Sequence, residues 1–335
     1  MRGVGDAPDA LRRASEAIAA AGIGLSSVGA VGHRIVHGGS VFTRTTLIDD
    51  AVLGGIRKLA WLAPLHNPVA AEVIAAARAA LPEVPHAAAF DTAFHATLPA
   101  EAHVYAVPYE WFKDWGYRRY GFHGLSVAWS VERARSLLGR DDVGVVVAHL
   151  GAGCSVSAVW RGRSVSTSMG MTPLEGLVMG TRAGSLDPGV LLAAQRDHGL
   201  DPRSLEEVLE HRSGLLALSG RTADMRELLT LAPTDERAAL AIAVFERSAA
   251  GAIAAAATAL PRLDAVVFTG GIGENAASVR AGIVRRLAAI GVPQVAVESV
   301  HADRVLVAGP VAVLVVFARE DAVIARELRA LTAAR

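Results

Sequence analysis

Apolar runs that end in glycines or polar residues recur along the chain, and they alternate with stretches in which apolar residues return every three or four positions. The runs predict buried β-strands within 28–39, 84–90, 143–153, 263–275 and 309–317. The periodic stretches predict helices at 8–21, 124–138, 236–259 and 319–334. Two β-rich runs joined through Gly162 predict a hairpin over 155–169.

Strands that alternate with helices predict an α/β fold. Glycine turns follow the strand ends at 38–39, 151–153 and 270–273, and ligands of such folds bind at the carboxyl ends of strands. A new series of strands begins after "GRDD". We therefore expect an N-terminal domain over 1–142, completed by the last helix at 321–335, and a C-terminal domain over 143–320.

Composition narrows the possible functions. The 335 residues carry a formal net charge of zero, which offers no basic surplus for nucleic acid. Hydrophobic residues make up 52 %, but no run of about twenty lacks charges, so no membrane span is expected. The single cysteine, Cys154, excludes an internal disulfide and fits a reducing cytoplasm.

Several polar residues lie in or near the turns that follow the predicted strands. Each of them, taken alone, could have an ordinary structural role. Arg34 and Arg182 could bind a phosphoryl or carboxylate group, or form surface ion pairs. Asp91 could cap a helix, and His123 or His66 could be structural. No G-x-x-x-x-G-K-[ST] loop, G-x-S-x-G elbow or zinc-type cluster occurs. Taken singly, these residues leave the function open.

The ordered set of motifs is more specific than any one of them. In chain order these are "GHRIVHGG", "APLHNP", "AFDTAFH", "YGFHGLS", "HLGAGCSVSAV", "MTPLEGLVMGTRAGSLDP", "SGRTADMREL", "FTGGIGEN" and "REDAVIA". The set resembles the acetate and propionate kinase family of the sugar kinase, Hsp70 and actin superfamily. The resemblance implies two related α/β domains flanking a catalytic cleft. It implies reversible transfer of the ATP γ-phosphoryl group to acetate, with propionate as a further substrate, giving acetyl phosphate and ADP.

The resemblance also implies roles for the residues that match its motifs. Arg34 and Arg182 would hold the carboxylate and phosphoryl groups, with Asp91, His123 and Arg182 as the catalytic set. The substrate site would further contain His66 and four apolar residues that enclose the acyl group: Val36, Leu65, Phe122 and Pro173.

On the nucleotide side, the phosphates of ATP or ADP would meet His149, Leu150, Gly151, Ala152 and Gly153. The adenosine would meet Asp224, Met225 and Arg226 with Gly270, Gly271, Ile272, Gly273, Glu274 and Asn275. Glu320 would hold Mg²⁺, with Mn²⁺ as an alternative ion. The family also implies a cytoplasmic homodimer without nucleic-acid or membrane partners.

The chain departs from the family pattern at two places. The family's first strand and phosphate turn do not precede "GHRIVHGG", which we expect to reflect a start assigned too far downstream. The family's "HLGNG" reads "HLGAG", so that Ala152 replaces an asparagine. Three interpretations stay open: an acetate kinase, a related propionate or butyrate kinase, and a non-catalytic nucleotide-binding paralogue.

Overall fold

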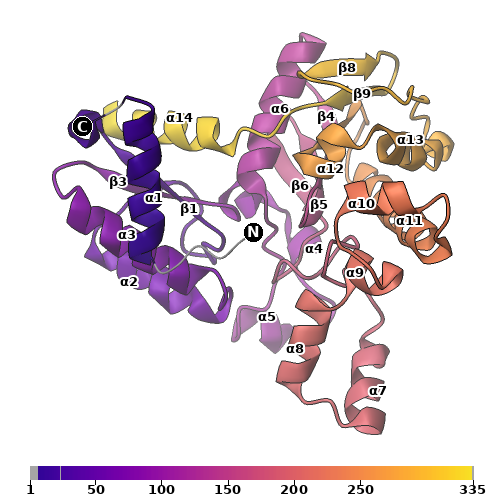
Figure 1. Ribbon diagram of the computed structural model, residues 1–335, viewed down its shortest axis with the longest axis horizontal. Coiled ribbons are helices and arrows are strands. Elements are labelled where there is room, and N and C mark those ends of the chain that lie inside the picture. The colour runs from indigo at the N-terminus through magenta and orange to yellow at the C-terminus, as the bar shows by residue number, and fades with distance from the viewer. Residues whose placement is uncertain (1–6, 23, 334–335) are drawn as a thin grey trace. The chain divides into compact units, whose positions relative to one another are not determined.

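A computed structural model describes residues 7–22 and 24–333 (Figure 1). By their contacts they form two compact units, which we call the first unit (within Met1–Ala96 and Arg319–Arg335) and the second unit (Thr97–Ala318). The boundary expected between residues 142 and 143 falls inside the second unit. The reason is that α6 (Gly124–Leu138) packs against strands β4 (Gly144–Leu150) and β7 (Ala265–Thr269) of that unit.

The first unit contains a small mixed sheet with strand order β1-β3-β2. Strand β1 (Val31–Ile35) runs parallel to β3 (His86–Phe90), and the short β2 (Thr46–Leu47) is antiparallel to β3. Side chains alternate between the two faces of a strand, so Gly32 and Arg34 share one face of β1. Helix α14 covers that face: a Cβ on Gly32 would lie 2.3 Å from Ile324 of α14. Arg34 is thereby directed towards α14.

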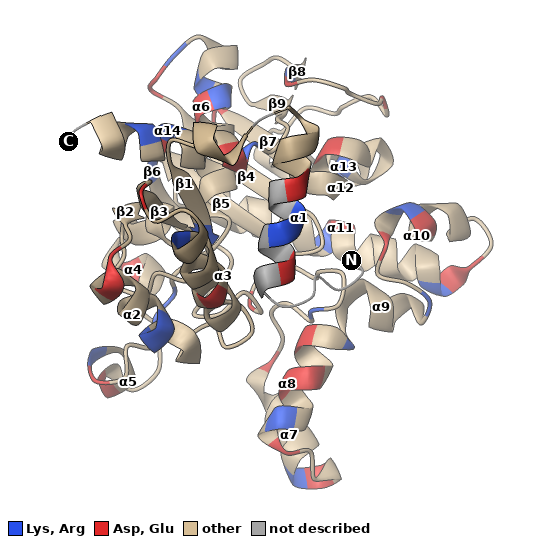
Figure 2. Cartoon of the chain, turned by 60° about the vertical axis from the view of Figure 1, so that its left-hand side comes forward, with Lys and Arg blue, Asp and Glu red and all other residues tan. Residues whose placement is uncertain are grey.

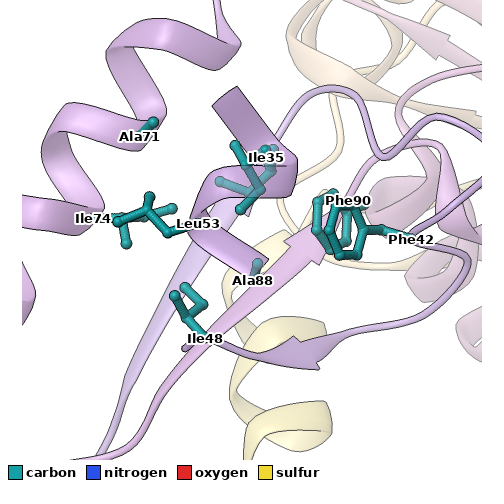
Figure 3. Packing of buried hydrophobic residues seen from close by; sticks show 9 residues of the cluster. Ile35, Phe42, Ile48, Leu53, Ala71, Ile74, Ala88 and Phe90 are labelled. Carbon is teal, nitrogen blue, oxygen red and sulfur yellow. The ribbon is translucent and has the colours of Figure 1, made fainter. Parts of the chain in front are cut away.

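The other face of β1 carries Ile35 into the core of the first unit. Ile35 packs with apolar residues from helices α2 and α3, from strand β3 and from the loop after β1, as Figure 3 shows. The rings of Phe42 and Phe90 stack there with centroids 4.8 Å apart. The whole cluster comprises Ile35, Phe42, Ile48, Leu53, Ile56, Ala71, Ile74, Ala88 and Phe90.

The helices of the first unit begin where their sequences favour a helix start. Asp49 precedes α2, and its side chain accepts a hydrogen bond from the Val52 N–H, as an N-cap residue does. Pro68 lies in the first turn of α3, where no backbone N–H is needed. The helical segments are α1 (Ala7–Ala20), η1 (Leu25–Ser27), α2 (Asp50–Lys58), η2 (Leu59–Trp61), α3 (Asn67–Ala80), η3 (Ala93–Thr97, which crosses into the second unit) and α14 (Glu320–Ala333).

The second unit is built on a larger sheet with strand order β6-β5-β4-β7-β9-β8. Strands β4, β7 and β9 (Ala312–Val315) are parallel, and they are buried along most of their lengths, which explains their continuous apolar sequences. Strands β5 (Cys154–Trp160) and β6 (Arg163–Thr167) form the predicted hairpin at one edge. Strand β8 (Arg304–Val307) closes the other edge.

Helices of the second unit lie before β4, between β6 and β7, and after β7. They are α4 (Ala100–His103), α5 (Tyr109–Lys113), α6, α7 (Pro188–His198), α8 (Pro202–His211), α9 (Gly214–Ser219), α10 (Met225–Leu231), α11 (Glu236–Ala257), α12 (Gly270–Asn275), α13 (Ala277–Arg285) and η4 (Ala288–Ile290). Figure 2 shows acidic and basic residues mixed along α7, α8 and α10, in keeping with a net charge of zero.

Helix α11 is the one described helix long and apolar enough to cross a membrane, judged by length and composition. In the structure α11 packs against β4 and β5, as well as against α9, α10 and α13. It also carries Glu246, which forms an ion pair with Arg286. These contacts are those of a core helix, and they account for its apolar sequence.

The sequence predicted most strands and four of the long helices, but it did not predict several other elements. The "GGIGEN" segment, expected as a turn before a helix, is itself the short helix α12. The helices within 50–80 and 188–231, and the strands β2 and β8, were not predicted. Most of them are short and give too few periods of the hydrophobic pattern to identify them. Helix α3, with 14 residues, is the exception, since it is as long as the predicted α1.

Candidate active site

In the first unit, one arginine lies between two carboxylates. Arg34 Nε and Nη2 donate to the two carboxylate oxygens of Asp91 over 2.9 and 2.7 Å. Its Nη1 lies 2.9 Å from Glu320 Oε2. The pairing follows from the fold, because Arg34 faces α14, which begins at Glu320, and Asp91 directly follows strand β3. Three residues far apart in sequence thus form one charged cluster, which we call the Arg34 cluster.

The carboxylates of the Arg34 cluster are held in a partly desolvated environment. Burial raises the pKa of Asp91, against the opposing effect of Arg34. Burial also raises the pKa of Glu320; Arg34 opposes this shift, whereas the nearby Asp91 and Asp321 add to it. With both acids ionised, two negative charges face one positive charge. An additional cation would therefore be stabilised beside these two carboxylates.

This charge imbalance suits Mg²⁺. Hard divalent cations prefer oxygen ligands, and Mg²⁺ is commonly bound by one or two carboxylates together with substrate phosphates. Among the residues that the structure describes, no group of three or more His, Cys, Asp and Glu side chains could hold a metal by themselves. The donor set of Asp91 and Glu320 fits an ion that takes its remaining ligands from nucleotide and water.

The turn after β1 is fixed by side chains that the sequence did not single out. The Asn67 side chain accepts from the His37 N–H over 3.3 Å and donates to the His37 carbonyl over 2.9 Å. Thr92 Oγ1 accepts from the Gly38 N–H over 3.0 Å, and His37 Nδ1 accepts from the Gly39 N–H over 2.9 Å. The fully buried His37 is thus part of the turn that follows Arg34, which is a structural position.

In the second unit, two histidines stack on one another. His123 and His149 have ring centroids 4.2 Å apart. The Nδ1 atom of His123 lies 3.0 Å from Ser155 Oγ, and that of His149 lies 2.8 Å from Ser126 Oγ. Each ring is therefore oriented by a serine hydroxyl, which leaves Nε2 of His123 directed elsewhere.

The backbone at His123 has an uncommon conformation. His123 precedes α6 with φ 56° and ψ 24°, in the left-handed region that non-glycine residues rarely adopt. Such strain is found most often at functional sites, where the surrounding structure holds a side chain in place. Here the serine contact and the stacked His149 hold the ring.

The Nε2 atom of His123 and the guanidinium of Arg182 both lie against Gly153. A Cβ on Gly153 would lie 3.4 Å from His123 Nε2 and 3.3 Å from Arg182 Nη1, so both groups pack directly on this glycine. Arg182 Nη1 also donates to the Pro173 carbonyl over 3.4 Å and lies 3.8 Å from the Met179 sulfur. No carboxylate is among these contacts of Arg182. We call His123, His149, Arg182 and Gly153 the Arg182 cluster.

Next to this cluster lies a cavity of about 740 Å³ within the second unit. This volume is typical of small-molecule sites. It is lined by eight of the residues expected to bind nucleotide, namely Gly151, Ala152, Asp224, Met225, Arg226, Gly271, Ile272 and Asn275. Ala223, Leu229 and Ala276, which the sequence did not identify, complete the lining.

One wall of the cavity is a local ion pair. Asp224 caps α10 by accepting from the Arg226 N–H over 2.8 Å, and its other oxygen lies 2.6 Å from Arg226 Nη2. The side-chain hydrogen bond with Arg226 lowers the pKa of Asp224 to about 2. The pair is exposed, so its value for stability is small. It does fix the orientation of both side chains at the cavity.

The other expected nucleotide residues lie outside the lining. Leu150, Gly270 and Gly273 are buried. The Glu274 carboxylate accepts from the N–H groups of Gly270 and Ala318, each over 2.9 Å. This side chain therefore links the first residue of α12 to the segment that follows β9. His149 and Gly153 belong to the Arg182 cluster.

The residues expected to enclose the acyl group come from both units. In the first unit Val36 is half-buried, Leu65 is 52 % exposed, and His66 immediately precedes α3. In the second unit Phe122 is buried, and Pro173 contacts Arg182 through its carbonyl. Within each unit they lie close in sequence or in space to the charged residues described above.

Comparisons with known proteins agree with these motifs. A family model described as the Acetokinase family matches residues 3–326. An acetate kinase from Deinococcus deserti is 48 % identical over 317 residues, covering 92 % of this chain and 79 % of the relative. A propionate kinase from Yersinia enterocolitica is 48 % identical over 273 residues, covering 80 % of this chain and 67 % of the relative.

Solved structures give the same result. The chain resembles a propionate kinase from Francisella tularensis with a TM-score of 0.91 and 38 % identity, covering 96 % of this chain and 84 % of that one. It resembles the Porphyromonas gingivalis acetate kinase with a TM-score of 0.89 and 33 % identity, with the same coverages of 96 % and 84 %. The expected α/β fold and the expected class of enzyme, a phosphotransferase with a carboxylate acceptor, are confirmed. This chain belongs to the Acetokinase family.

Proposed function

We propose that this protein is an acetate kinase, which transfers the γ-phosphoryl group of ATP to acetate and also accepts propionate. The observation that carries the proposal is the Arg182 cluster. A guanidinium without a carboxylate among its contacts lies beside His123 and packs on Gly153. Gly153 follows Gly151 and Ala152, which line the nucleotide-sized cavity.

The reaction needs little from the protein beyond positioning and charge stabilisation. An oxygen of the acetate carboxylate attacks the γ-phosphorus, forming the new P–O bond as the bond to the leaving oxygen of ADP breaks. Acetate is ionised near pH 7, so no proton has to be removed from it. Negative charge develops on the equatorial oxygens of the phosphoryl group. Arg182 and His123 would donate hydrogen bonds to these oxygens.

We assign the Arg34 cluster to the acceptor and metal. Arg34 is the cation that would orient the acetate carboxylate, and its present hydrogen bonds to Asp91 and Glu320 would be rearranged when acetate binds. Asp91 and Glu320 would hold Mg²⁺, or Mn²⁺ in its place. When bound, the ion would offset the negative charge of the nucleotide phosphates.

We assign the adenosine to the cavity lined by Asp224, Met225, Arg226 and the exposed side of α12. The acyl group would be enclosed by Val36, Leu65, Phe122 and Pro173, with His66 nearby. One additional methylene changes binding by only about 1–3 kcal/mol, so propionate should remain a substrate.

The direct test is ATP-dependent hydroxamate formation from acetate, propionate and butyrate in the presence of Mg²⁺. The proposal expects turnover with acetate, a lower rate with propionate and the lowest rate with butyrate. Turnover that is fastest with propionate or butyrate would assign the chain to a related acyl kinase. ADP binding by calorimetry without turnover of any of the three acids would identify a non-catalytic nucleotide-binding protein, the function favoured by Ala152 in the cavity lining.

We further propose that the enzyme is a cytoplasmic homodimer. The buried free thiol of Cys154 supports a reducing compartment. Sedimentation equilibrium would test the dimer: a single species with the mass of one 34.8 kDa chain would contradict it.

A further inference from the structure

Glu175 lies at the centre of a hydrogen-bond network that no motif role explains. The Tyr105 hydroxyl donates to Glu175 Oε2 over 2.5 Å. Arg119 Nη2 donates to Glu175 Oε1 over 2.5 Å. The Arg119 guanidinium also lies over the Tyr105 ring, 5.4 Å from its centroid. Both oxygens of the carboxylate are thus engaged by partners from a different part of the chain.

The network fixes the loop that contains Glu175. Arg119 Nη1 donates to the Ser168 carbonyl over 2.8 Å, and the Tyr105 hydroxyl accepts from the Met171 N–H over 3.0 Å. Gly170 lies against the centre of the network: a Cβ there would lie 1.9 Å from Glu175 Oε2 and 2.2 Å from the Tyr105 hydroxyl. A residue larger than glycine at position 170 would therefore disrupt these hydrogen bonds. The loop 168–175 is held along its length by two side chains.

The same loop supports the segment that leads to His123. The Gly170 carbonyl accepts from the Tyr120 N–H over 3.0 Å and from the Gly121 N–H over 3.3 Å. Two residues after Gly121 the chain enters the left-handed conformation at His123. The position of the Gly170 carbonyl therefore constrains the backbone that holds His123.

The loop also supports Arg182. Pro173 lies two residues before Glu175, and its carbonyl accepts from Arg182 Nη1 over 3.4 Å. A single anchored loop thus contacts the backbone before His123 on one side and the Arg182 guanidinium on the other.

The chemistry of the network favours a fixed arrangement. The side chains of Arg119 and Glu175 are 18 % and 34 % exposed, so their ion pair is partly shielded from water. Burial, together with the hydrogen bond to Glu175, raises the pKa of Tyr105, which keeps its hydroxyl protonated as a donor. Charge-assisted hydrogen bonds of this kind are about twice as strong as neutral ones.

We propose that Glu175 is a positioning residue for phosphoryl transfer, which sets His123 and Arg182 in place through the loop 168–175 without touching the substrate. This inference rests on the proposed kinase function and adds a residue to it. The lining of the nucleotide cavity contains none of Tyr105, Arg119 and Glu175. Loss of the network should therefore lower kcat and leave the KM for ATP unchanged.

The test compares Glu175→Gln, Tyr105→Phe and the double variant with the wild-type chain. Glu175→Gln removes the charge and places an amide against Arg119. Tyr105→Phe removes both hydrogen bonds of the hydroxyl, to Glu175 and from the Met171 N–H, but keeps the charged Arg119–Glu175 pair and is the milder change. A displacement of about 1 Å can lower a rate by about two orders of magnitude, so we expect kcat to fall about 10- to 100-fold in Glu175→Gln and less in Tyr105→Phe. The KM for ATP should stay within about twofold, and the double variant should match Glu175→Gln because both changes break one network.

Asp264→Asn is the matched control. Asp264 also pairs with arginines, Arg140 and Arg262, and accepts from the Gly144 N–H at the start of β4, at the opposite end of this strand from His149. The control should lower the melting temperature without changing kcat.

If wild type turns over and kcat is unchanged in both Glu175→Gln and Tyr105→Phe, Glu175 has no positioning role. If wild type does not turn over, the proposed kinase function is wrong and this inference is overturned with it. Should Glu175→Gln fail to fold, Tyr105→Phe alone decides.

Discussion

Each unit contains an arginine within one of the motifs, and the two arginines have different partners. One is paired with carboxylates and the other is not. Arg34 is paired with two carboxylates, Asp91 and Glu320, which together carry more charge than it can neutralise. The hydrogen bonds of Arg182 in the structure go to a carbonyl and a thioether. The Arg34 cluster therefore carries a residual negative charge when its acids are ionised, whereas the Arg182 cluster carries an uncompensated positive one.

From this difference we infer that the two clusters would bind ions of opposite charge. An arginine without a carboxylate partner can stabilise an anion without first losing an existing ion pair, which is what the charge of a phosphoryl group in transfer requires. An excess of carboxylate charge suits a divalent cation. Substitutions in the two clusters should accordingly affect activity and stability in different proportions.

The largest effect is expected for Arg34→Gln. The substitution leaves Asp91, which is 2 % exposed, buried without its bidentate partner. Breaking a buried ion pair costs about 3–5 kcal/mol, and because Arg34 itself is 42 % exposed we expect about 2–4 kcal/mol of lost stability, together with loss of kinase activity. Urea unfolding and the hydroxamate assay measure the two effects. The control Arg78→Gln breaks a pair with the exposed Asp50 of the same unit and should change stability by about 0.5 kcal/mol at most.

Arg182→Gln should affect activity alone. Removing one preorganised donor to a charged transition state lowers kcat by about 10²- to 10³-fold. Because no carboxylate is left unpaired, the melting temperature should match that of the wild type. The exposed Arg196→Gln is the control for loss of a positive charge. A clear loss of stability in Arg182→Gln would mean that this arginine has a structural partner and would remove the contrast with Arg34.

Glu320→Gln should lower activity while leaving the metal-free protein as stable as before, or more stable. Burial raises the pKa of Glu320 in the folded state, so its ionised form opposes folding near neutral pH and its neutralisation removes that cost. We expect the Mg²⁺ concentration for half-maximal activity to rise and kcat to fall by about two orders of magnitude. Asp321→Asn, one residue further along, is the control. An unchanged Mg²⁺ dependence would contradict the metal assignment.

The first unit should also lose stability on acidification, through a buried pair of histidines. His33 Nε2 and His86 Nδ1 lie 3.0 Å apart, and His86 Nε2 lies 3.0 Å from the Leu81 carbonyl. Burial, with a contribution from His86, lowers the pKa of His33 to about 4. Between pH 6.5 and about 4 the unfolded chain therefore binds a proton that the folded chain does not, and stability falls as pH falls through this window.

This linkage amounts to about 2 kcal/mol between pH 7 and pH 5. His33→Phe keeps an aromatic ring against His86 and should remove that part of the pH dependence, measured as the difference between urea unfolding curves at the two pH values. The partly exposed His103 supplies the control, His103→Phe, which should keep the wild-type pH dependence. Identical pH dependence in wild type and His33→Phe would contradict a lowered pKa of His33 in the folded protein.

The smallest effect is expected on the nucleotide side, from Ala152→Asn. Ala152 is exposed and lines the cavity, and the related motif has an asparagine at this position. An added amide donor to a phosphate should improve binding by about 1 kcal/mol, which lowers the KM for ATP several-fold. Ala152→Val adds bulk without a donor and should raise this KM. If Ala152→Asn does not lower the KM, position 152 does not contact the phosphates.

The sequence by itself determined the elements whose patterns are long or continuous. Helix α6 occupies residues 124–138, as its periodicity predicted, and β4 and β7 occupy the apolar runs that predicted them. The ordered motifs identified the family, and eight of the expected nucleotide residues line one cavity. These features are local: a buried strand, a long helix and a glycine-rich motif each carry their signal in neighbouring residues.

Only the tertiary structure decided how the charged residues are paired. Arg34 and Asp91 are 57 residues apart in sequence and meet because β1 and β3 are neighbours, in parallel register, in the first sheet. Ser155 and Ser126 orient the two histidines from a strand and a helix, and no pattern distinguishes them from other serines. Side-chain pairing depends on strand register and helix packing, which form through contacts between distant parts of the chain. The sequence therefore proposed the candidate residues, and the fold determined which arginine is paired with carboxylates and which is not.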